Sequence, residues 1–324
     1  MVKSWQEKSE LFSAPKGFFA VLLSLAMLFG IISPQATDSK ITFKDDQSVE
    51  LSFAALSDTH MKNNSFRPYY LQRFFNDIDN SNTDLDALLI AGDLTNSGKK
   101  NQYSALFDVL DTQTNFDRIL LTMGNHDARS NFDANKETIM NKVSQYLGID
   151  TNGKSYYSYD INGYTFIMLC TESQKEYVRA DISDEQLNFL DSELARAAEN
   201  GKPAFVVCHQ PLKDTHGLPA AFVNGDIGDR SQQVRDIVTK YKNVFFISGH
   251  LHDGAYEKSF EVLSQENNIH AVNLPAYGEK NGEGQYRTAG IGYIVEVYGD
   301  EIVFTLRNFK DGKATDFSKT LELI

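Results

Sequence analysis

Residues 118–127 read Arg-Ile-Leu-Leu-Thr-Met-Gly-Asn-His-Asp, and the rest of the chain is organised around this stretch. Its first half is a short apolar run, which predicts a buried strand. Gly124 then permits a tight turn, and three side chains that can bind a metal or transfer a proton follow it: Asn125, His126 and Asp127. By itself the turn could be an ordinary polar one, so its meaning depends on how the other strands end.

Four other apolar runs end in side chains of the same chemistry. They are followed by Asp58-Thr59-His60, Gly92-Asp93, His209 and Gly249-His250-Leu251-His252. Imidazole and carboxylate groups together are suitable ligands for Zn, Mn or Fe. Because strand residues two positions apart share a face, we expect Asp58 and His60 to point at one site. The same rule applies to His250 and His252.

Strands and helices alternate along most of the chain. Apolar residues at helical spacing predict helices near 68–80, 103–110, 139–147, 187–194 and 231–240, with apolar strands between them. Asn162-Gly163 predicts a hairpin turn, residues 290–308 a second hairpin, and Ser183–Gln186 a capping box. The pattern predicts an α/β fold with a substantially parallel sheet. In such folds ligands bind beyond the carboxyl ends of the strands.

Two long stretches without periodicity, 211–230 and 275–289, each follow a strand. We expect them to form walls of a substrate pocket, with exposed mobile loops as the alternative. His216 in the first stretch could contact substrate. Arg129, just beyond the central turn, could reach a phosphate or form a surface salt bridge.

Composition and the N-terminus limit the class of protein. The chain of 324 residues has a formal net charge of −13, which disfavours nucleic acid as its main partner. Residues 17–33 carry no charge and follow Lys16, which predicts a signal peptide or membrane anchor over residues 1–36. A domain over 37–324 would then lie outside the cytoplasm. Cys170 and Cys208 both fall in apolar runs, which favours buried free thiols over a disulfide.

The candidate ligands outnumber the positions around one tetrahedral ion. They are Asp58, His60, Asp93, Asn125, His209, His250 and His252. Two ions about 3.5–4 Å apart, sharing a bridging carboxylate, use this set better. Such a pair suits the hydrolysis of phosphoesters, because it neutralises phosphate charge and lowers the pKa of a bound water.

These motifs, in this order, resemble those of the calcineurin-like metallophosphoesterases. The resemblance covers roughly residues 51–275 and implies a fold of two packed mixed β-sheets flanked by helices, a four-layer sandwich. It implies that Asp58, His60 and His252 hold one metal, that Asn125, His209 and His250 hold the other, and that Asp93 bridges them. By the same resemblance His126 contacts phosphate or protonates the leaving oxygen. Asp127 would orient His126 or pack in the turn.

The expected activity is a dimetal-dependent hydrolysis of small extracytoplasmic phosphomonoesters or phosphodiesters, nucleotides included. The cofactors would be two divalent or trivalent ions of Mn, Fe or Zn. Residues 92–98 and 124–129 also look like the bacterial branch that includes cyclic-nucleotide phosphodiesterases. Two alternatives remain at this stage, a nuclease on the same fold and a non-enzymatic interaction module. The sequence makes no prediction of the oligomeric state.

Overall fold

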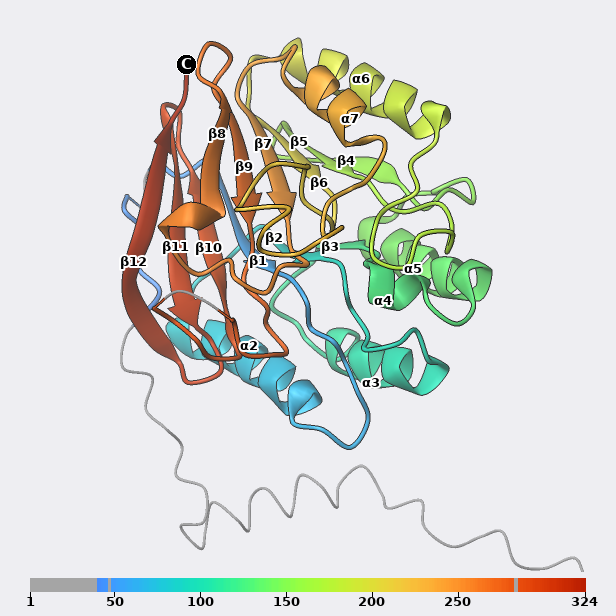
Figure 1. The fold of residues 1–324 in the computed structure, drawn as a ribbon. Coiled ribbons are helices and arrows are strands. Elements are labelled where there is room, and N and C mark those ends of the chain that lie inside the picture. Colours follow the sequence, from blue (N-terminus) through green and yellow to red (C-terminus); the bar gives the residue numbers. More distant parts are fainter. Residues whose placement is uncertain (1–39, 46–47, 283–284) are drawn as a thin grey trace, which may run out of the picture. The chain divides into compact units, whose positions relative to one another are not determined.

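Two mixed β-sheets of six strands each form the centre of the protein (Figure 1). The structure is a computed structural model that describes residues 40–45, 48–282 and 285–324. The strands of the first sheet are β1 (Leu51–Leu56), β2 (Ala87–Ala91), β3 (Ile119–Thr122), β10 (Ile291–Val297), β11 (Glu301–Asn308) and β12 (Lys313–Glu322). Those of the second are β4 (Tyr157–Ile161), β5 (Tyr164–Met168), β6 (Ala204–Val207), β7 (Val244–Ser248), β8 (Phe260–Ser264) and β9 (Ile269–Asn273).

Parallel pairing dominates the interior of both sheets. The first sheet has the order β12-β11-β10-β1-β2-β3, in which β1, β2 and β3 run parallel. The second has the order β4-β5-β6-β7-β9-β8, in which β5, β6, β7 and β9 run parallel. Antiparallel strands lie toward one edge of the first sheet and at both edges of the second. The candidate ligands all follow parallel strands.

The two sheets pack through aromatic side chains. Phe53 of β1 makes edge-to-face contacts with Phe166 of β5 and Phe205 of β6, with ring centroids 5.3 Å apart in each pair. Such pairs contribute about 0.5–1.5 kcal/mol beyond the area they bury. This core extends to residues of α2 (Arg67–Ser81), α3 (Lys100–Leu110) and α5 (Phe132–Leu147). A second core joins the other sheet to α6 (Asp184–Ala198) and α7 (Ser231–Val238).

The structure confirms the predicted sandwich of two mixed sheets flanked by helices and differs from the sequence prediction in its details. Strand β12 was not predicted because its side chains are mostly polar, as suits an edge strand with an exposed face. The predicted capping box is only half formed. The Ser183 hydroxyl accepts a hydrogen bond from the Gln186 N–H at 3.1 Å, but the Gln186 amide bonds the backbone of Cys170 instead of reaching back.

Both cysteines are buried free thiols, as predicted. Burial raises the pKa of the Cys170 and Cys208 thiols to about 12, so both stay protonated at neutral pH. The expected signal or anchor, residues 1–36, lies outside the described residues. Within the described part, no helix is long and apolar enough to cross a membrane.

Candidate metal centre

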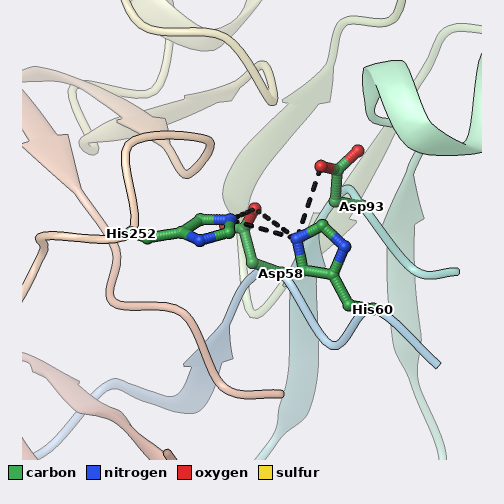
Figure 2. A group of neighbouring side chains, drawn as sticks. All are labelled: Asp58, His60, Asp93 and His252. Atoms are coloured by element: carbon green, nitrogen blue, oxygen red, sulfur yellow. Dashed lines mark hydrogen bonds and ion pairs between the residues drawn. The ribbon is translucent and has the colours of Figure 1, made fainter. Parts of the chain in front are cut away.

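Five parallel strands, three from the first sheet and two from the second, place the candidate ligands. Asp58 and His60 follow β1, Asp93 follows β2, Asn125 follows β3, His209 follows β6, and His250 and His252 follow β7. Their side chains converge where the ends of the two sheets meet. Figure 2 shows four of them, with the rings of His60 and His252 turned toward the carboxylates of Asp58 and Asp93.

The backbone at these positions is unusual. Five of the seven residues have φ in the left-handed region, between 42° at His60 and 71° at His250: Asp58, His60, Asp93, His250 and His252. Non-glycine residues seldom adopt this conformation, and it concentrates at functional sites. The strand rule of alternating faces therefore does not apply here, although His250 and His252 do face one centre, because their two ligand groups share Asp93. The two imidazoles fall in different ligand groups.

The first group comprises Asp58, His60, Asp93 and His252, whose ligand atoms all lie within 4.8 Å of one another. The Nε2 atoms of His60 and His252 are 3.0 Å apart. His252 Nε2 is 3.0 Å from Asp58 Oδ1, and His60 Nε2 is 3.6 Å from Asp93 Oδ2. Donor atoms about 2.1 Å from a tetrahedral ion lie about 3.4 Å from one another. These separations therefore suit a shared cation.

The second group comprises Asp93, His209 and His250. His209 Nε2 is 3.3 Å from Asp93 Oδ2, and its other ring nitrogen, Nδ1, lies 2.8 Å from the Ala91 carbonyl oxygen. An Nδ1–H donated to that carbonyl leaves Nε2 free to act as a ligand. Asp93 belongs to both groups, as a bridging carboxylate would.

Buried ligand atoms without hydrogen-bond partners show that this donor set fits cations. Asn125 Oδ1 and His250 Nε2 are both buried and lack such a partner. Leaving a buried acceptor unsatisfied costs about 1–3 kcal/mol. A metal ion satisfies both lone pairs, and amide oxygen and imidazole nitrogen are accepted ligands of transition metals.

The carboxylates and imidazoles strongly perturb one another. Burial alone would raise the pKa of Asp58, but the neighbouring His252 and His209 hold it well below its usual range. Burial would likewise lower the pKa of His209 and His252, yet Asp93 and Asp58 raise both to about 9. His250 behaves oppositely, because burial and the neighbouring His209 lower its pKa to about 3. The site therefore attracts positive charge between its two carboxylates.

His126 lies at the edge of this centre and is not part of either ligand group. Its backbone N–H donates to Asp93 Oδ1 at 2.8 Å, and its ring Nε2 is 3.9 Å from Asp93 Oδ2. Ring Nδ1 is 2.7 Å from the Asn96 carbonyl oxygen, which fits an Nδ1–H donor. Burial lowers the pKa of His126, and the nearby Arg129 guanidinium acts in the same direction.

Asp127 takes the second of its two expected roles and packs in the turn. Its buried carboxylate accepts hydrogen bonds from the backbone N–H groups of Leu94, Thr95 and Gly124 and from the Thr95 hydroxyl, at 2.8–3.0 Å. Burial and the nearby Asp93 raise its pKa to about 6. Asp127 thus ties the turn after β3 to the turn after β2. It acts as a positioning residue through these hydrogen bonds.

The two long loops do border the centre. In the first, the Phe222 ring stacks on the His250 ring with centroids 5.0 Å apart. In the second, Glu279 Oε2 lies 3.7 Å from His252 Nδ1, and the same carboxylate pairs with Arg67. Sequence reasoning did not single out Phe222, Glu279 or Arg67, because their partners are far away in the chain and no local pattern marks them.

In the structure, His216 and Arg129 each contact a defined partner. The backbone N–H of His216 donates to the Glu261 carboxylate at 2.7 Å, and its ring Nδ1 lies 3.2 Å from the Lys258 carbonyl oxygen. Arg129 lies over the Tyr177 ring, 4.3 Å from its centroid. The Tyr177 carbonyl in turn accepts a hydrogen bond from Asn125 Nδ2 at 3.4 Å.

Comparison with known proteins agrees with this geometry. Residues 51–254 match the family model of calcineurin-like phosphoesterases. A probable cyclic nucleotide phosphodiesterase from Rhodococcus erythropolis is 30% identical over 228 residues, which cover 68% of this chain and 69% of that protein. A second such protein, from Fibrobacter succinogenes, is 26% identical over 58% of this chain and 64% of its own length.

Among solved structures, a dimetal phosphatase from Danio rerio matches 85% of this chain and all of its own, with a TM-score of 0.63 and 13% identity. A likeness at that identity supports the fold alone. The family match and the Asp and His ligands that the structure gathers together establish the class. The chain belongs to the calcineurin-like phosphoesterase family and is a metal-dependent phosphoesterase.

Proposed function

We propose that this chain hydrolyses phosphodiester bonds in small molecules, cyclic nucleotides among them, with two ions of Mn, Fe or Zn. The observation that carries the proposal is the position of Asp93, whose carboxylate belongs to both ligand groups. The printed names of the relatives from Rhodococcus and Fibrobacter support a diester substrate. We also propose an extracytoplasmic location, on the basis of the charge-free run 17–33 behind Lys16.

The residues divide between the two ions by their geometry. Asp58, His60 and His252 would hold one ion, Asn125, His209 and His250 would hold the other, and Asp93 would contact both. When bound, such a pair of ions neutralises phosphate charge and lowers the pKa of a water molecule. The rest of the chemistry falls to protein side chains.

His126 is the residue placed to handle the leaving group. Its Nδ1–H is donated to the Asn96 carbonyl, and its Nε2 therefore faces the Asp93 carboxylate. As an imidazolium, protonated at Nε2 as well as at Nδ1, His126 can pass the Nε2 proton to the oxygen of the departing alcohol and is left neutral, and the same N–H can bind a phosphate oxygen. The hydrogen bond from the His126 backbone N–H to Asp93 fixes the separation between this ring and the bridging carboxylate.

The test is Asp93→Ala, with turnover measured on bis(4-nitrophenyl) phosphate and on a 3′,5′-cyclic nucleotide in added Mn, Zn or Fe. We expect the wild type to bind two ions per chain and to hydrolyse both substrates. Asp93→Ala should bind fewer ions and lose turnover, because it removes the shared ligand. Asp108→Ala, the same change on the exposed face of α3, is the matched control and should behave as wild type. Two ions and normal turnover in Asp93→Ala would contradict the bridging assignment.

A further inference from the structure

The surroundings of the two ligand groups differ in character. The first group borders a charged pair, because Glu279 lies beside His252 and is bound to Arg67. The second group borders the exposed Phe222 residue, whose ring stacks on His250, and the loop of the exposed Tyr177, whose backbone carbonyl accepts a hydrogen bond from Asn125, the further ligand proposed for the same ion. This asymmetry offers two chemically different surfaces to a molecule whose phosphate lies at the centre.

Phe222 is held in a fixed orientation although part of its ring is exposed. Its ring stacks on the ring of His250 at an interplanar angle of 30°. Gly225 lies close to the ring, since a Cβ at that position would lie 2.6 Å from a ring carbon. The Gly225 N–H also donates to the Phe222 carbonyl at 3.0 Å, which closes the turn. The Phe222 residue is 36% exposed, so a bound molecule can reach it.

Tyr177 is fixed beside the same group by a different loop. Its carbonyl accepts a hydrogen bond from Asn125, and the next residue, Val178, accepts one from Gln210 at 3.1 Å. Gln210 follows His209 directly, so this loop is attached next to His209 and Asn125, which are proposed to hold the same ion. The Tyr177 ring lies against the Arg129 guanidinium, and the residue is 67% exposed.

Exposed rings that are held rigidly beside a phosphate-binding centre are suited to stacking. A planar aromatic group stacks on Phe or Tyr with little loss of side-chain entropy, whatever its hydrogen-bonding pattern. We propose that Phe222 and Tyr177 bind the planar group of the substrate, a nucleobase or other aromatic ring, on the His250 side of the centre. The inference rests on the proposed function and adds which part of the substrate is recognised and by which side chains.

The experiment compares two ligands with the same phosphate and sugar, adenosine 5′-monophosphate and ribose 5-phosphate. Binding of each to the Mn-loaded protein is measured by calorimetry for the wild type, Phe222→Leu and Tyr177→Ala. We expect the wild type to prefer the adenosine compound. Loss of one ring should weaken binding of the adenosine compound by about 5- to 150-fold, the range expected for a lost base-stacking contact. Ribose 5-phosphate should bind all three proteins equally.

Tyr69→Ala, which removes an exposed aromatic ring from α2, is the matched control and should change neither affinity. Equal weakening of both ligands in Phe222→Leu or Tyr177→Ala would overturn the inference, because the rings would then act only by positioning His250 or Asn125. Unchanged binding of the adenosine compound, or no preference for it in the wild type, would also overturn it. Failure of the proposed function would give a different result, because the wild type would then not hydrolyse phosphodiesters with Mn, Fe or Zn.

Discussion

Gly124 offers a sharp test of how closely the strand ends must approach one another. A Cβ built on this residue would lie 2.1 Å from Asp93 Oδ1 and 2.3 Å from the Asp93 backbone nitrogen. Its φ of −100° is accessible to any residue, so Gly124→Ala acts through steric overlap and not through backbone strain. The backbone contact cannot be relieved by a side-chain rotation, so the two turns must separate.

The expected loss follows from the distances. Carbon pairs reach optimal contact at about 3.5–4.0 Å, so relief of the overlap requires a shift of about 1 Å or more. That shift weakens the hydrogen bond from the His126 N–H to Asp93 and displaces the shared ligand. Overpacking of this kind costs about 1–3 kcal/mol of unfolding free energy. A misplacement of 1 Å at a reacting centre can lower turnover about 100-fold.

The assay measures turnover of bis(4-nitrophenyl) phosphate, metal content per chain and urea unfolding for Gly124→Ala. The control is Gly148→Ala, since Gly148 has a φ of 67° and nothing within 4 Å of its Cβ position. Left-handed strain should lower its unfolding free energy by about 1–2 kcal/mol, while turnover and metal content stay at the wild-type level. If Gly124→Ala keeps two ions and turnover within about twofold of wild type, the reasoning from close approach is refuted.

Three further predictions concern stability, catalysis and location. Asp77→Ala should lower the unfolding free energy in urea by about 3–5 kcal/mol, because it removes the carboxylate that the buried Arg307 binds at 2.6 and 2.8 Å. The double variant Asp77→Leu with Arg307→Met should lose less, and an equal loss would contradict this account. His126→Ala should lower turnover of an alkyl ester by about 10²–10⁴-fold and turnover of a nitrophenyl ester less, with unchanged metal content. Equal losses of turnover on the two esters would favour phosphate positioning over proton donation. Loss of a metal ion from the variant would make His126 a ligand. Protease added to intact cells should digest the domain over 37–324, and protection until lysis would reverse the proposed location.

The chemistry of the site could be predicted from the sequence because each ligand sits next to a recognisable apolar run. Asp58, Asp93 and His209 each come within two residues of a predicted strand that the structure confirms. Parallel strands bring their carboxyl ends together, so residues far apart in the chain could be placed at one edge without knowledge of their contacts. The order of these short motifs then identified the family.

The surroundings of the ligands could not be predicted in the same way. Phe222, Tyr177 and Glu279 lie in stretches with no helix or strand period, and their partners are in other segments. The left-handed turns at His250 and His252 also broke the alternation expected for a strand, since one φ in that region turns the following side chains to a new direction. Turn geometry of this kind depends on packing between segments as well as on residue type.

Asp127 shows why residue type alone does not assign a role. Its carboxylate could bind a cation, orient His126 or accept N–H groups, and all three roles favour the same side chain at that position. The structure decides among them through three backbone N–H donors and the Thr95 hydroxyl, contributed by the turns after β2 and β3, and through the Tyr103 hydroxyl of α3 at 3.4 Å. These bonds hold the segment that carries Asp93 against the segment that carries Asn125 and His126. Asp127, which belongs to neither ligand group, therefore sets the distance between Asp93 and the segment of Asn125 and His126.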